Sequence, residues 1–229
     1  MYFGDSTFFL LLPALFLAFF AQAKVRTTYR RYSQVMASSR ISAAKTARIL
    51  LDAGGAGDVT IERTEGSLTD NYDPRKKALR LSVGVHDSSS IAALGIAAHE
   101  AGHALQHHEA FAPLAVRNAI FPVVNIGSML AFPLFFLGLL TSSRGPSVLM
   151  DIGILLFSGA VLFSVITLPV EFNASKRAIA LLQAHGFMSR PEIDGARSVL
   201  SAAALTYVAS TAMAVVQLLR MFLIRGSRD

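Results

Sequence analysis

Four long stretches without a charged residue constrain what this chain can fold into. Each contains between 18 and 26 consecutive uncharged, mostly apolar residues, and a helix needs about 20 such residues to cross a bilayer. Hydrophobic residues make up 53% of the 229 residues and charged residues only 16%, which leaves too little polar chain to cover four apolar helices in water. The sequence therefore predicts an integral membrane protein, with spans at 6–23, 118–143, 148–170 and 198–224.

The positions of the positive charges predict how these spans are oriented. Of the 21 Lys and Arg residues, 17 lie in the polar segments 24–117 and 171–197. Because cytoplasmic segments are enriched in Lys and Arg, we expect both segments in the cytoplasm and the N-terminus outside. The basic residues follow the first apolar run instead of preceding it, which indicates an uncleaved anchor. Four full crossings would place three C-terminal arginines outside, against this rule: Arg220, Arg225 and Arg228. Whether the last helix crosses the membrane completely therefore stays open.

The composition also excludes some classes of partner and ligand. A net charge of +6 can indicate nucleic-acid binding, but the basic segments lack the interleaved aromatic residues on which bases stack. We therefore expect no nucleic-acid partner. The chain has no cysteine, so disulfides are excluded and any metal ligands must be histidines or carboxylates.

The segment 24–117 contains the pattern His99-Glu100-x-x-His103. On a helix, positions i and i+4 lie on one face, so both imidazoles can bind one metal ion. Glu100 is close enough to act on a water molecule as a general base, which is the zinc-protease arrangement. The apolar run 91–98 before the motif favours a helix, and Asp87 and three serines offer N-cap residues. Three ligands on successive turns would be spread over about 12 Å, so His107 is not expected to be a third ligand.

The rest of this segment predicts a small α+β part. Helical periodicity indicates a helix at 41–53, ended by two glycines. Alternating patterns indicate strands at 59–63 and 78–83, which we expect to form a short hairpin. The edge at 79–83 could pair with an extended peptide substrate, or the hairpin could only brace the motif helix. Glycine and polar residues between these strands are read as turns.

A catalytic zinc usually has three protein ligands and one open position. Glu171 is the candidate for the third, because it follows the third span on the same side of the membrane as His99 and His103. It is also predicted to begin a helix, where the helix dipole favours an anion. The position of Glu171 alone supports two interpretations equally: a metal ligand, or an ordinary glutamate in the first turn of a helix.

Four stretches carry a resemblance to a known family: 72–76 (YDPRK), 79–82 (LRLS), 97–106 (AAHEAGHALQ) and 171–175 (EFNAS). They closely resemble the bacterial membrane-bound neutral zinc metallopeptidases, over nearly the whole chain. The resemblance implies Zn²⁺ bound by His99, His103 and Glu171, with Glu100 as base. More distantly similar membrane peptidases carry the third ligand in a Glu-x-x-x-Asp pattern, whose Asp holds a ligating histidine. Ser175 stands in that position here, so either Asn173 or another group is expected to replace the Asp.

We therefore expect a mainly α, polytopic membrane protein of a single domain, 1–229, with a zincin-like α+β part in the cytoplasm. The implied function is a zinc-dependent endopeptidase of the bacterial inner (cell) membrane, with its active site facing the cytoplasm. Its partners would be the lipid bilayer and a membrane-associated protein or peptide substrate. Tyr72, His86 and His185 are candidate oxyanion donors. Alternatives are an intramembrane metalloprotease and a zinc-binding scaffold or partner of another protease. Homo-oligomers and partner proteins stay open.

Overall fold

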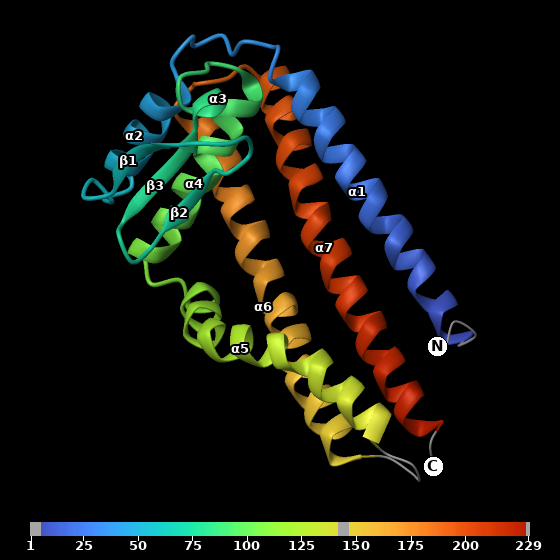
Figure 1. Ribbon diagram of the computed structural model, residues 1–229. Helices are drawn as coiled ribbons and strands as arrows, with labels where there is room; N and C mark the ends of the chain where they lie inside the picture. Colours follow the sequence, from blue (N-terminus) through green and yellow to red (C-terminus); the bar gives the residue numbers. More distant parts are fainter. Residues whose placement is uncertain (1–5, 142–146, 228–229) are drawn as a thin grey trace. The chain divides into compact units, whose positions relative to one another are not determined.

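A computed structural model describes residues 6–141 and 147–227 of the chain, so Arg228 lies outside the described part. The helices and strands of this part follow one another as η1 (Ser6–Leu10), α1 (Leu11–Tyr32), α2 (Ala43–Ala53), β1 (Thr60–Thr64), β2 (Asn71–Asp73), β3 (Ala78–Ser82), α3 (Val83–His86), α4 (Ile91–His108), α5 (Ala112–Thr141), α6 (Val148–Ala184) and α7 (Arg190–Gly226) (Figure 1). These helices and strands form two compact units. One comprises Met1–Gln22, Val116–Leu168 and Thr206–Asp229, and the other Ala23–Ala115 and Pro169–Leu205.

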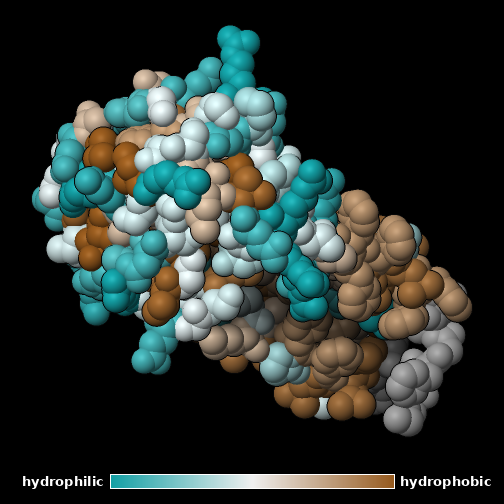
Figure 2. Space-filling model, turned by 90° about the horizontal axis from the view of Figure 1, so that it is seen from above, coloured by the Kyte–Doolittle hydropathy of each residue, from teal (hydrophilic) through white to brown (hydrophobic). Residues whose placement is uncertain are grey.

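Four helices are long and apolar enough to cross a membrane: Thr7–Tyr32, Ala112–Thr141, Val148–Ala184 and Arg190–Gly226. Large apolar side chains are exposed along them, such as Phe16, Val123 and Leu140, and this exposure is unfavourable in water but not in lipid. Figure 2 shows hydrophobic residues gathered over the long helices and hydrophilic ones over the unit that contains the sheet. The expected mainly α membrane protein is confirmed.

The second unit is organised around α4, which packs against α2 and the sheet (Figure 1). The predicted helix at 41–53 is confirmed as α2, and the Ser42 side chain accepts a hydrogen bond from the Lys45 amide at its N-terminus. Its buried face presents alanines and leucines to a core that it shares with α4. Gly55, at φ +79°, follows the C-terminus of α2. Local sequence signals therefore place this helix correctly.

The strand pairing differs from the expectation. The sheet order is β1-β3-β2, and β1 pairs with β3 in parallel, so the expected hairpin between 59–63 and 78–83 is wrong. A hairpin is present, but β2 and β3 form it, and β2 comes from residues that the sequence marks as a turn. Because β3 pairs on both sides, its backbone is not available to a peptide. The predicted substrate edge at 79–83 is therefore also wrong, and the free edges belong to β1 and β2.

Helix α6 corrects one further expectation. It continues through Pro169 without ending, so Glu171 lies in the helix interior and not at a helix N-terminus. The dipole argument for Glu171 therefore does not apply. Proline is tolerated within long helices of membrane proteins, since neighbouring groups satisfy the freed carbonyl. Two of the arginines near the end of α7 have polar partners: Arg225 contacts Asp151, and Arg220 contacts Thr7.

Helices α4 and α6 approach each other closely at one glycine. A Cβ atom on Gly102 would lie 2.9 Å from the Ala174 carbonyl oxygen, a backbone atom that cannot rotate away. Two turns earlier on α4, Gly95 has more space, because a Cβ there would lie 3.5 Å from the Ala196 side chain, at ordinary contact distance. Only Gly102 is therefore required by close packing of the two backbones.

This contrast predicts opposite effects of the same substitution at two positions in one helix. Gly102→Ala should destabilise the protein by about 1–3 kcal/mol, because it overpacks the α4–α6 contact. Gly95→Ala should be neutral or stabilise by up to about 1 kcal/mol, since alanine is the better helix former. Thermal unfolding of the detergent-solubilised proteins measures both. Equal effects at the two positions would contradict the assigned packing.

Candidate metal centre

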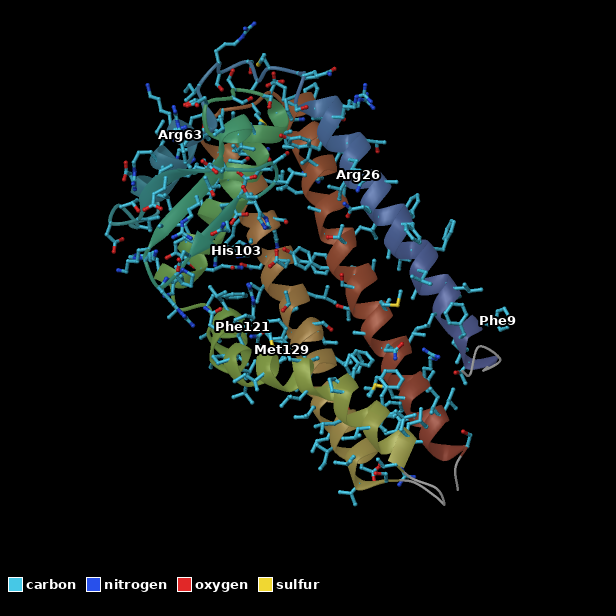
Figure 3. The ribbon with its side chains drawn as sticks, viewed as in Figure 1. Phe9, Arg26, Arg63, His103, Phe121 and Met129 are labelled. Atoms are coloured by element: carbon cyan, nitrogen blue, oxygen red, sulfur yellow. The ribbon has the colours of Figure 1, made fainter. Side chains whose placement is uncertain are left out.

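Helix α4 places the two histidines of the motif side by side. The Ser90 side chain accepts a hydrogen bond from the Ala93 amide and caps the helix, as the cluster of N-cap residues predicts. His99 and His103 lie one turn apart on α4, and Figure 3 labels His103. Their rings meet edge to face with centroids 4.7 Å apart, and their Nε2 atoms are 3.2 Å apart. Both rings therefore direct Nε2 into one small volume.

Helix α6 adds a carboxylate to this volume. The Glu171 side chain is only 4% exposed, and its Oε2 lies 3.4 Å from His99 Nε2 and 3.5 Å from His103 Nε2. Each of the three residues thus offers one ligand atom, and these atoms lie within 4.8 Å of one another. Within residues 6–141 and 147–227, this is the one group of three or more such side chains that could hold a metal ion.

The opposite ring nitrogens are held by hydrogen bonds. His99 Nδ1 lies 3.1 Å from Ser175 Oγ, and His103 Nδ1 lies 3.0 Å from Gln106 Oε1. Ser175 itself therefore contacts a motif histidine from the position of the missing Asp. Asn173 contacts neither ring nitrogen, and its Oδ1 instead accepts hydrogen bonds from Gln106 and Arg177. Such bonds to the far nitrogen orient the rings of metal-binding histidines.

The donor set and the local charge both fit a zinc ion. Two imidazole nitrogens and one carboxylate oxygen are ligand types that catalytic zinc sites use. Burial alone would lower the pKa of His103, but the hydrogen bond to Glu171 and the charges of Glu100 and Glu171 raise it. The surroundings of the ring therefore favour a positive charge. Glu100 is not in the three-residue cluster, and it lies on α4 next to His99.

Other polar residues that the sequence singles out lie apart from the cluster. His107 Nδ1 is 2.8 Å from the Tyr72 hydroxyl, and His107 is not among the three clustered residues, as expected. His86 contacts Arg63 and Asp87. His185 follows the end of α6, where its ring contacts the carbonyl of the preceding turn.

Tyr72 is the candidate oxyanion donor that contacts the motif helix. It lies on β2 and bonds to His107 of α4. Its pKa is raised to about 12, mainly by burial and further by the charges of Asp58 and Asp73, so its hydroxyl keeps its proton at neutral pH. A cavity of about 190 Å³ lies beside it and is lined by Ala56, Asp58, Val59, Tyr72, Lys77, Ala104, His107 and His108.

The sequence reasoning missed Gln106 and Arg177. Gln106 is fully buried, and the only available signal was a polar residue three positions after His103, on the same helix face as that histidine. Arg177 resembled an ordinary basic residue of α6, yet its side chain contacts both Asn173 and Glu109. The contacts of Gln106 with Val170 and of Arg177 with Glu109 join segments that are distant in the sequence.

Comparison with known proteins agrees with this centre. Residues 7–226 match the family described as "Putative neutral zinc metallopeptidase". Among curated proteins, the chain is 49% identical over 216 residues to "Putative membrane protease YugP" of Bacillus subtilis (strain 168), covering 94% of this chain and 95% of that protein. No solved structure is significantly similar. Because the family match covers almost the entire sequence, this chain belongs to the neutral zinc metallopeptidase family.

Proposed function

We propose that this protein is a zinc-dependent endopeptidase that acts at the cytoplasmic surface of the membrane. The observation that carries the proposal is the convergence of His99, His103 and Glu171, with Glu100 on the same helix as the two histidines. A structural zinc site needs no adjacent base, whereas peptide hydrolysis does. The zinc metallopeptidase family and the membrane-protease relative support the same assignment.

In this proposal each residue has a separate task. His99, His103 and Glu171 hold the zinc ion, which when bound polarises the scissile carbonyl and lowers the pKa of water. Glu100 accepts a proton from the attacking water and transfers it to the leaving amine. Ser175 and Gln106 keep the two imidazole rings oriented. The neutral Tyr72 hydroxyl is available as a hydrogen-bond donor near α4.

The substrate is a protein or peptide segment close to the bilayer. β2 lies at one edge of the sheet and packs against α4, so an extended peptide can pair with its free backbone groups beside the motif helix. In this proposal the substrate pairs with the edge formed by β2 and not with β3. Segments 24–117 and 171–197 form the catalytic part in the cytoplasm, because they hold 17 of the 21 Lys and Arg residues.

The first test is the substitution Glu100→Gln, assayed on an unfolded protein such as casein with detergent-purified, zinc-loaded protein. Loss of the general base should lower cleavage by about 10²–10⁴-fold. The zinc content should remain that of the unmodified protein, because Glu100 is not a ligand in this proposal. Zinc content by atomic absorption and cleavage by gel electrophoresis give the two measurements.

Each outcome of this test selects one reading. Equal cleavage by both proteins would identify a contaminant and remove the activity assignment. If neither protein cleaves casein and Glu100→Gln leaves the cellular function intact, the alternative of a zinc-binding scaffold is supported instead. Loss of zinc in Glu100→Gln would contradict the proposed separation of base and ligands.

The contact between Ser175 and His99 gives a second prediction. Ser175→Ala should weaken zinc binding by about 10–100-fold, because the histidine ring loses the hydrogen bond that orients it. Ser198→Ala is the matched control, since the Ser198 hydroxyl bonds to the backbone of its own helix. Competition with a zinc-chelating dye measures both affinities, and an unchanged affinity in Ser175→Ala would argue against this role.

The proposed orientation can be tested because the chain contains no cysteine. A single cysteine at the exposed position Glu65 should resist a membrane-impermeant maleimide in intact cells, since the surrounding segment is cytoplasmic. A single cysteine at the exposed position Ser227 should be labelled, because four spans place it outside. Both should react after lysis. Labelling of Glu65→Cys in intact cells would reverse the orientation.

A further inference from the structure

A buried glutamine connects the candidate metal centre to α6. The Gln106 amide nitrogen donates to the Val170 carbonyl oxygen at 2.9 Å, and Oε1 lies 3.0 Å from His103 Nδ1. A carbonyl oxygen can only accept, so the amide nitrogen must face Val170 and the amide oxygen must face the histidine. His103 Nδ1 therefore carries a proton. In the neutral ring, Nε2 then carries the lone pair, on the side of Glu171 and His99.

The chain of hydrogen bonds continues along α6. The Gln106 amide nitrogen also donates to Asn173 Oδ1 at 2.9 Å, and the same oxygen accepts from Arg177 Nε at 2.8 Å. A guanidinium has no acceptor atom, so the Asn173 oxygen, and not its amide nitrogen, must face Arg177. Each bond direction is thus determined by a group that can act in only one way: the Val170 carbonyl at one side and Arg177 at the other.

The turn between α4 and α5 holds the outer end of this chain of hydrogen bonds. Arg177 Nη1 donates to Glu109 Oε1 at 2.7 Å, and its guanidinium lies 5.9 Å from the centre of the Phe111 ring. The hydrogen bond from Arg177 lowers the pKa of Glu109, so this carboxylate stays ionised at neutral pH. Ala110, between Glu109 and Phe111, has φ +53°, in the left-handed region that residues other than glycine rarely adopt.

The two motif histidines are held in different ways. His99 Nδ1 contacts the Ser175 hydroxyl, and a hydroxyl can donate or accept, so it does not select a tautomer. His103 contacts an amide oxygen whose orientation is determined by its neighbours. The Val170 carbonyl and the Asn173 side chain, which Arg177 holds in turn, therefore orient Gln106, and through Gln106 they select the tautomer of His103.

We propose that Gln106, Asn173 and Arg177 are positioning residues that hold His103 in the tautomer that binds zinc. We call this set, together with Glu109 at its outer end, the histidine relay. The inference rests on the proposed function, because it takes the centre to be a zinc site. It assigns roles to polar residues that touch neither the ion nor the substrate.

The test compares two substitutions of one residue. Asn173 serves the relay only as an acceptor, so Asn173→Asp should retain most of the zinc affinity, whereas Asn173→Leu removes the acceptor and should raise the zinc dissociation constant by about 10–100-fold. Arg177→Met, near the outer end of the relay, should raise the zinc dissociation constant by about 10-fold. Lys176→Met, the same loss of charge at the exposed neighbouring position of α6, is the matched control and should have no effect.

Two measurements on detergent-purified protein decide the matter. Competition with a chelating dye gives zinc affinity, and the visible absorption spectrum of the Co²⁺-substituted protein reports ligand geometry independently of activity. We expect altered spectra for Asn173→Leu and Arg177→Met only. If Asn173→Leu does not fold, Arg177→Met against Lys176→Met decides alone.

Failure of the relay and failure of the proposed function give different results. Equal zinc affinity in Asn173→Leu and the unmodified protein would overturn the relay, as would equal weakening by Asn173→Asp and Asn173→Leu. Absence of zinc binding by the unmodified protein would overturn both proposals. Zinc binding with the expected order of affinities but no peptide cleavage would support the relay and count against the peptidase.

Discussion

The close contact of α4 and α6 at Gly102 is the constraint on which the candidate centre depends. His99 and His103 come from α4, and Glu171 comes from α6, about 70 residues later in the chain. Their ligand atoms can meet only if the two helix backbones approach within side-chain reach, and the lack of a side chain on Gly102 permits this against the Ala174 carbonyl. Small residues at helix contacts commonly allow such an approach. Packing therefore creates the candidate site, and the motif supplies only two of its three clustered residues.

Burying the side-chain amide of Gln106 is acceptable only because its hydrogen-bonding groups are satisfied. A buried polar group without a hydrogen bond costs about 1–3 kcal/mol, and Gln106, although fully buried, bonds to Val170, Asn173 and His103. A network that satisfies its members also restricts their orientation. The same bonds that make burial of these side chains tolerable thus also fix the orientation of the His103 ring.

Expectations from sequence succeed where the signal is local and fail where distant segments meet. The cap at Ser90, the end of α2 and the four apolar helices follow from neighbouring residues. Strand pairing does not, because alternation predicts a strand but not its partner. β3 therefore lies between β1 and β2 and not at an edge. Glu171 was expected to begin a new helix after the third span, but the long helix continues through Pro169.

The sequence by itself determined that the chain is a membrane protein, that residues 99–103 form a two-histidine motif on a helix, and that Glu171 is a candidate partner. These properties depend on hydropathy and on helical periodicity, which a linear sequence carries directly. Only the tertiary structure decided that Ser175 and Gln106 hold the histidine rings and that Arg177 and Glu109 extend this contact to the surface. Those bonds join side chains from separate helices, and their existence depends on the packing distance and rotation of α4 against α6, which no local pattern encodes.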